Sequence, residues 1–295
     1  MNRLTRKLYT FFCETRSLFA KIFMTAPNVL NTDETLDLVI NHHYSISRNG
    51  DGEIDIMLGQ DIPFQKYDAR LAQLMKEAIV YQGDKYISAI PNIFKSVNRF
   101  NPKAQYYFQR YLKLKRWNYY KLARAERYGD TQISRFYIDY VDKSNSAKQV
   151  EKLKQIWLGQ KVLLIEGAES RLGVNNDLFD GCKLLHRILA PSENAFSVYD
   201  HIKKSVFDIA NNYDLILLAL GPTATALAYE FAKQGLWAVD IGHIDIEYEW
   251  FLMKADHKVP IIGKYTNEST EGKLIGSLPY HTLEIYHNQI IKNIL

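Results

Sequence analysis

Two carboxylates stand one residue apart on a glycine-rich turn early in the chain. Asp51 and Glu53 flank Gly52, and Arg48 and Gly50 come just before them. Glycine permits a tight backbone turn, and hard divalent cations prefer carboxylate oxygens as ligands. Asp51 and Glu53 on such a turn suit a hard divalent cation such as Mg²⁺ or Mn²⁺, whose other ligands are diphosphate oxygens and water, although an Asp-x-Glu pair by itself is common. Arg48 and Gly50 are expected beside the phosphates.

A second group of ionisable residues follows a predicted strand near residue 241. His243, Asp245, Glu247 and Glu249 alternate with apolar residues between Asp240 and Trp250. If the segment is helical, Asp245 and Glu249 share one face. Either carboxylate is a candidate general base for an acceptor hydroxyl, and His243 is expected near the diphosphate. The sequence does not decide which of the two carboxylates is the base. The alternative to a catalytic role is that these charged residues are solvated at the start of a helix.

Two further segments are candidates for phosphate contact. Gly221 and Thr223 flank a proline at a predicted helix start, where free backbone N–H groups suit a diphosphate. Arg171 follows a predicted strand and offers a fork-shaped guanidinium. Both signals are weak, because ordinary helix starts look similar and Arg171 fits a pair with a neighbouring carboxylate equally well.

The elements that must position these residues alternate between apolar strands and amphipathic helices. This pattern predicts a Rossmann-like α/β fold, a parallel sheet with helices on both faces. The polar clusters then fall beyond the carboxyl ends of strands, where open parallel sheets bind ligands. The predicted strands are 44–47, 161–166, 196–199, 213–220 and 236–241, and the predicted helices are 35–40, 177–189, 201–211 and 222–234. The polar stretch 145–149 is the best candidate for an internal boundary.

Two segments carry clustered cations. Residues 4–23 have helical apolar spacing with Arg6, Lys7, Arg16 and Lys21 opposed only by Glu14, so they predict a basic amphipathic helix. Such a helix suits either an anionic membrane surface or packing on its own domain. We therefore divide the chain into a basic segment, 1–31, and a single domain, 32–295. Residues 92–140 add a helical aromatic and basic insertion, but no nucleic-acid-binding signature accompanies them.

Composition narrows the class of protein. The chain has 295 residues, 47% of them hydrophobic, and a formal charge of +4, too small to indicate nucleic-acid binding. Cys13 and Cys182 belong to no paired motif, which argues against a disulfide framework or zinc site. No signal-peptide block or membrane-length apolar run is seen. A cytoplasmic protein is expected, with peripheral contact to the inner face of the membrane through the basic helix.

Taken in order, four motifs resemble the GT-D glycosyltransferases of bacterial adhesin-glycosylation and surface-polysaccharide loci. The resemblance covers about Thr32 to Lys264, and its motifs are Arg48–Glu53, Gln60–Asp68, Gly221–Ala224 and Asp240–Trp250. It implies an Asp-x-Glu metal site and transfer from a UDP-sugar, with glucose the first donor to try and inversion favoured. The implied acceptor is a glycan on a glycoprotein, polysaccharide or lipid carrier.

Other classes stay open. The main alternative is a non-catalytic nucleotide-binding or membrane-scaffolding protein, which would release no UDP from a UDP-sugar. A metal-dependent phosphotransfer enzyme is a weaker alternative, because the Walker-type Gly-x-x-x-x-Gly-Lys motif is absent from the sequence. The choice of sugar, the acceptor hydroxyl and homo-oligomerisation are not decided by the residues.

Overall fold

The computed structural model describes residues 3–266, 268–269, 272, 276 and 279–295. Its strands are all parallel and form one sheet in the order β3-β2-β1-β7-β6-β4-β5-β8. The strands are β1 (Ser45–Arg48), β2 (Tyr86–Ile90), β3 (Gly129–Asp130), β4 (Lys161–Gly167), β5 (Leu184–Ala190), β6 (Leu215–Ala219), β7 (Ala238–Asp240) and β8 (Ile290–Asn293). The expected parallel α/β sheet is confirmed.

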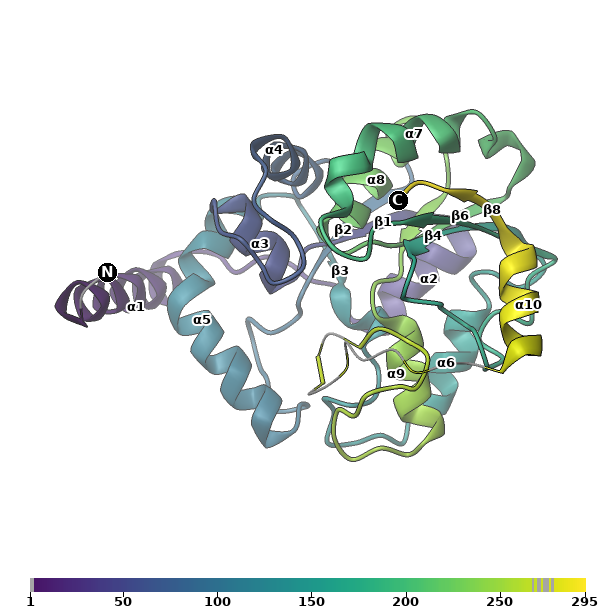
Figure 1. Cartoon of the computed structure of the whole chain (residues 1–295). Helices are drawn as coiled ribbons and strands as arrows, with labels where there is room; N and C mark the ends of the chain where they lie inside the picture. The colour runs from purple at the N-terminus through teal and green to yellow at the C-terminus, as the bar shows by residue number, and fades with distance from the viewer. Residues whose placement is uncertain (1–2, 267, 270–271, 273–275, 277–278) are drawn as a thin grey trace.

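Helices cover both faces of this sheet (Figure 1). They are α1 (Arg3–Phe23), α2 (Thr32–His42), α3 (Asp51–Met57), α4 (Ala69–Ala78), α5 (Pro102–Leu122), α6 (Ser146–Lys154), α7 (Tyr199–Phe207), α8 (Pro222–Lys233), α9 (Ile244–Leu252) and α10 (Tyr280–Gln289). Short 3₁₀ helices span Thr131–Ser134, Ala195–Val198 and Ala210–Asn212.

Alternate side chains of each strand build two separate cores. In β4, Leu163 and Ile165 face the core that α3, α4, α7 and α8 cover. Val162 and Leu164 face the opposite core, under α2, α6 and α9. Both sides of the strands are therefore buried, which explains why they are apolar throughout rather than alternating.

The neighbouring strands β1 and β7 send the chain to opposite faces of the sheet. The helix that follows β1 is α3, on one face, and the helix that follows β7 is α9, on the other. A reversal of this kind opens a crevice at the carboxyl edge of a parallel sheet, where ligands of such folds bind. Asp51 begins α3 and His243 precedes α9, so the two acidic motifs meet at this crevice.

Two expectations about secondary structure were wrong. The segment expected to be helical over 177–189 contributes β5, and the strand expected over 196–199 is a 3₁₀ turn continuing into α7. Residues 184–190 form a short apolar run whose pattern fits a buried helix as well as a strand, and pairing with β4 and β8 decides for the strand. Stretch 145–149 lies at the start of α6, and β1 and β7, from either side of it, pair directly in the sheet.

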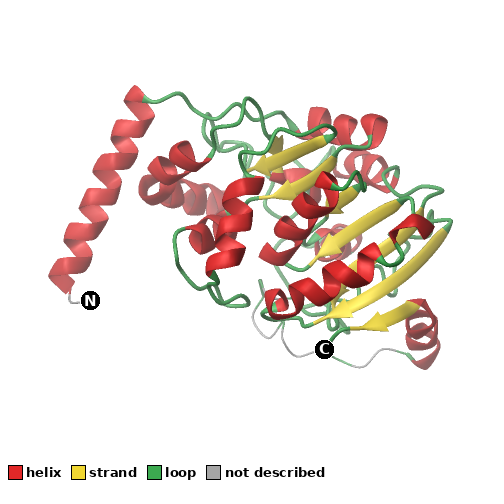
Figure 2. Cartoon of the chain, turned by 90° about the horizontal axis from the view of Figure 1, so that it is seen from above, coloured by secondary structure: helices red, strands yellow, loops and turns green. Residues whose placement is uncertain are grey.

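The N-terminal helix lies at the periphery of the molecule (Figure 2). As the sequence predicts, α1 is a single long helix, and it packs against α5, the basic and aromatic insertion between β2 and β3. None of the helices within the described residues is long and apolar enough to cross a membrane.

Candidate active site

A cavity of about 780 Å³ opens at the carboxyl edge of the sheet. Residues at or just after the ends of six strands line it, together with side chains from α3 and α5. A cavity of this size accommodates a ligand the size of a nucleotide. The lining at the strand ends consists of Arg48, Pro91, Thr131, Gly167, Ala219 and Asp240.

Arg48 and Asp240, the last residues of β1 and β7, form the centre of the cavity. The Asp240 carboxylate accepts hydrogen bonds from the backbone N–H groups of Arg48 (3.2 Å) and Gly242 (3.1 Å) and lies 3.7 Å from Arg48 Nη1. Arg48 Nε also donates to the Thr131 carbonyl oxygen at 3.3 Å. Burial raises the pKa of Asp240 to about 6, even though Arg48 and the backbone donors oppose the shift.

Gly242 provides the space that the Arg48 side chain occupies. Its φ is +46°, and a Cβ added there would lie 1.7 Å from Arg48 Nη1. Only glycine combines this backbone conformation with such a close approach at low cost. The Gly in the Asp240–Trp250 motif is therefore explained by the placement of Arg48.

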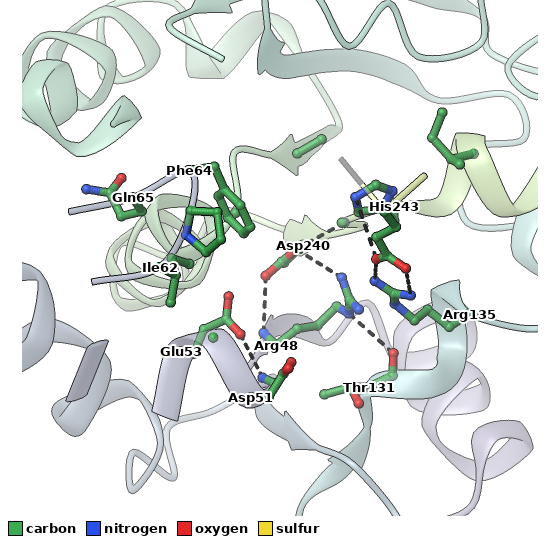
Figure 3. Close-up of a pocket in the computed structure, with 18 of the residues that line it drawn as sticks. Arg48, Asp51, Glu53, Ile62, Phe64, Gln65, Thr131, Arg135, Asp240 and His243 are labelled. Carbon is green, nitrogen blue, oxygen red and sulfur yellow. Dashed lines mark hydrogen bonds and ion pairs between the residues drawn. The ribbon is translucent and has the colours of Figure 1, made fainter. Parts of the chain in front are cut away.

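The Asp-x-Glu motif lies beside this centre, on the first turn of α3. Figure 3 shows Glu53, Arg48 and Asp240 grouped at one part of the cavity, with Asp51 beside them. Glu53 Oε2 accepts from the Gly50 N–H at 2.8 Å, which caps the helix. Burial, together with the negative charges of Asp240 and Asp51, raises the pKa of Glu53 to about 7. The site thus concentrates more negative charge than Arg48 compensates.

Cations gather on the opposite wall around one carboxylate. Glu268 accepts two hydrogen bonds from the Arg135 guanidinium, one of them at 3.0 Å, and another from Lys258 Nζ at 2.7 Å. His243 Nε2 lies 3.9 Å from the same carboxylate. Burial opposes ionisation of Glu268, but Arg135, His243 and Lys258 together hold its pKa well below the usual range. Arg135, Lys258 and His243 all line the cavity.

A family model described as the glycosyltransferase GT-D fold matches residues 46–269, most of the chain and all of this site. The chain belongs to this GT-D family. It is 40% identical over 268 residues to the probable glycosyl transferase Gly of Streptococcus gordonii and 38% identical to the glycosyltransferase GlyD of Streptococcus pneumoniae. These matches cover 90% of this chain but 39% and 32% of the two relatives, so the chain spans about a third of their length.

Solved structures of the GT-D family share the whole fold. A new glycosyltransferase from Streptococcus sanguinis superposes with a TM-score of 0.86 at 39% identity, covering 91% of this chain and all of that one. A second structure, described as a conserved domain with a distinct glycosyltransferase fold, gives the same TM-score at 37% identity and covers 97% of this chain and all of that one.

The two candidate bases of this GT-D chain are held in a buried ion cluster. Lys264 Nζ lies 2.7 Å from Asp245 Oδ2 and 2.7 Å from Glu249 Oε1. Asn176 Nδ2 donates to both carboxylates, and the Gly173 N–H donates to Asp245 Oδ1 at 2.9 Å. The two carboxylates share a helix face, as their spacing predicts. These contacts hold α9, but Asp245 also lines the cavity, so the proton transfer expected of the two carboxylates stays a prediction.

The expected phosphate contacts are only partly brought together. Gly221 lines the cavity at the start of α8 with φ +53°, and Gly50 and His243 line it too. Thr223 is fully buried, with its hydroxyl 3.5 Å from Gln65 Oε1. Among the described residues, Arg171 does not line the cavity, and its guanidinium donates to the Gly263 carbonyl oxygen at 3.0 Å.

Two lining residues of this GT-D site carry no sequence motif. Tyr107 of α5 donates its hydroxyl to Asp51 Oδ2, and Arg135 follows the 3₁₀ turn after β3. Their partners lie far away in the sequence, at Asp51 and Glu268, so spacing cannot reveal them. The available signal was Tyr107's place in the aromatic and basic insertion.

Proposed function

We propose that this chain transfers a sugar from a UDP-sugar donor to a glycan acceptor with the help of a divalent metal ion. The observation that supports this proposal is the group of three carboxylates, Asp51, Glu53 and Asp240, whose charge Arg48 compensates only in part. They lie at the crevice beside β1 and β7, in a cavity large enough for a nucleotide. UDP-glucose is the first donor to test, and an inverting reaction is favoured. The acceptor is a glycan on a glycoprotein, a polysaccharide or a lipid carrier.

The residues present fit a metal that binds together with the donor. Among the described residues, no three His, Cys, Asp or Glu side chains are arranged as a preformed metal cage. Mg²⁺ and Mn²⁺ with nucleotides need only one or two carboxylates, because phosphate oxygens and water complete the shell. Asp51 and Glu53 would hold the ion, whose bound charge would offset the burial that raises the pKa of Glu53. When bound, the metal supplies stabilisation of the charge on departing UDP.

The protein's own cations complete the donor site. Arg48 is held at the cavity centre by Asp240 and Thr131, where a guanidinium can donate to a diphosphate oxygen. His243 and the start of α8 at Gly221 face the same cavity and would bind phosphate oxygens. These groups, fixed before the donor arrives, would stabilise negative charge as it develops on the leaving group.

We assign Asp245 and Glu249 to positioning. A base must reach an acceptor hydroxyl with a free lone pair, whereas both oxygens of Asp245 and Oε1 of Glu249 already accept hydrogen bonds from Lys264 or Asn176. By fixing the first turns of α9, they fix His243 at its start. Retention of turnover in Asp245→Asn protein that still folds would be consistent with this assignment, whereas a loss of about 10²–10⁴-fold without loss of stability would identify a base.

The test is UDP release from UDP-glucose with Mn²⁺ or Mg²⁺, in wild-type protein and in Asp51→Asn and Glu53→Gln variants. The amide oxygen that Glu53→Gln introduces can still accept the Gly50 N–H bond, so this variant removes charge while keeping the cap. Asp208→Asn, at the exposed end of α7, is the matched control. Both site variants should lose release and the control should keep it.

The alternatives predict different outcomes of the same assay. A nucleotide-binding scaffold would bind UDP and release none from any UDP-sugar. Full activity of Glu53→Gln, or activity unchanged by a chelator, would refute the metal assignment. A donor screen with the other common UDP-sugars separates a wrong choice of sugar from a wrong class of protein.

A further inference from the structure

The helix α1 exposes a long apolar face that no part of the described chain covers. Leu4 and Phe11 are 67% and 70% exposed, although both are large hydrophobic side chains. Residues three or four positions apart lie on one side of a helix. The exposed residues that share this spacing are Leu4, Leu8, Phe11, Leu18 and Ile22, with Phe12, Phe19 and Phe23 beside them.

The opposite side of α1 is the one that packs on the protein. Ser17 and Ala20 are buried against the body, and the Arg16 guanidinium stacks on the Trp117 ring of α5 at 4.5 Å from its centroid. The packing role expected for this helix therefore uses one side only. Exposed aromatic and aliphatic area of this extent marks an interaction surface on soluble proteins.

Charge indicates which partner fits this face. The α1 sequence carries five cations against Glu14 alone, and the α5 sequence carries six cations and no acid, so the two packed helices hold a net +10. Because the whole chain is only +4, its remaining residues have a net charge of −6. A second copy would bring another strongly cationic layer against the first, which electrostatics disfavours. An anionic surface is complementary to it.

We propose that α1 binds the interface of an anionic lipid bilayer. The helix would lie parallel to the membrane plane, with its apolar face at the boundary between headgroups and acyl chains and its cations near lipid phosphates. A helix with a large apolar face, a cationic flank and too little apolar length to span fits this mode of binding. Lys7 and Lys21 are exposed beside the apolar face and would contact the headgroups.

This attachment would also set where the active site stands. Helix α5 lies between α1 and the cavity, since it packs on α1 and lines the cavity with Lys103 and Tyr107. Bilayer binding through α1 would therefore hold the cavity one helix layer from the lipid surface. The lipid interaction itself does not depend on the donor or metal assignments, because no α1 residue lines the cavity.

The test is flotation of the full chain with phosphatidylglycerol-containing vesicles and with phosphatidylcholine vesicles, at low and high salt. We expect recovery with the anionic vesicles that salt weakens. The triple variant Leu8→Gln/Phe11→Gln/Ile22→Gln should lose this recovery almost completely. Exposed apolar residues elsewhere provide the matched control, Val141→Gln/Leu158→Gln, which should float like wild type.

A second variant isolates the charge. Lys7→Gln/Lys21→Gln should bind anionic vesicles roughly 30-fold more weakly, from about fivefold per cation lost near the surface. Unchanged thermal unfolding and UDP release in every variant would show that the fold and site are intact. A Leu8→Trp probe should shift its emission to the blue with anionic vesicles.

Two results would overturn the proposal. Equal recovery of wild type and triple variant with anionic vesicles would show that the apolar face does not bind lipid. A concentration-dependent dimer in sedimentation, abolished by the triple variant and accompanied by no vesicle binding, would assign the face to a second copy of the chain.

Discussion

Replacing Lys264 by methionine tests whether the ion cluster under α9 is structural. Lys264 and Asp245 have 1% and 2% of their side chains exposed, and Glu249 has 12%. Lys264→Met would leave both carboxylates buried without their cation. Removing one partner of a buried ion pair typically costs about 3–5 kcal/mol, because the remaining charge stays desolvated. For a chain of this length that is a fall in Tm of roughly 6–10 °C.

The assay is thermal and guanidinium unfolding of wild type and variants at pH 7. Lys152→Met is the matched control, since Lys152 pairs with the exposed carboxylates of Asp33 and Asp37. Such surface pairs are worth about 0–1 kcal/mol, so this control should unfold near the wild-type Tm.

Rescue distinguishes loss of charge compensation from loss of packing. Adding Asp245→Asn and Glu249→Gln to Lys264→Met removes the uncompensated charges while keeping side chains that can accept from Asn176. Most of the lost stability should return. If Lys264→Met unfolds within about 1 kcal/mol of wild type, or the triple variant is no more stable than the single one, the reasoning about this cluster is refuted.

Two further outcomes follow from the cavity centre. Gly242→Ala should lose UDP affinity, measured by calorimetry, because the added Cβ displaces Arg48. Gly235→Ala is the control: Gly235 has φ +76° and open space around it, so this variant should suffer only backbone strain of about 1–2 kcal/mol. Equal UDP affinity in both variants would remove Arg48 from the donor site. Burial raises the pKa of Glu53 to about 7, so above pH 4.5 the folded state binds more protons than the unfolded state. The free energy of unfolding of the metal-free protein should therefore fall as the pH rises from about 5 to 7. Glu53→Gln should make that part of the stability profile less steep, and an unchanged profile would contradict the raised pKa.

The sequence predicted the parallel sheet and the position of Asp51 and Glu53 just after a strand, because these signals are local. Strand β4 is a continuous apolar run, and Asp51 follows directly on a strand end and a glycine turn. Local signals failed where pairing decides the structure. Residues 184–190 form a strand because they pair with β4 on one side and β8 on the other. The seven residues of the strand contain no signal of this pairing.

The side-chain roles of the candidate site were harder to predict, because they depend on distant partners. Asp245 has the position expected of a base, but its Oδ2 accepts a hydrogen bond from Lys264, nineteen positions later in the sequence. Arg171 has the right residue type, yet its bond to Gly263 turns it from the cavity. A carboxylate or guanidinium next to a strand end is therefore a candidate only until its partners are known.

Under the proposed function, the cavity would bind a metal–diphosphate complex rather than either component alone. The charge of Asp240 helps to raise the pKa of Glu53, and a bound cation would relieve this repulsion. Arg135 and Lys258 line the other wall, where Glu268 pairs with both and Asp139 also pairs with Lys258, so a diphosphate would compete with these carboxylates for the two cations. A bare cation would satisfy the first wall only, and a bare diphosphate would meet the carboxylates of Asp51 and Glu53. A ligand that carries both charges satisfies the two walls at once, which is the physical reason to expect metal and donor to bind together.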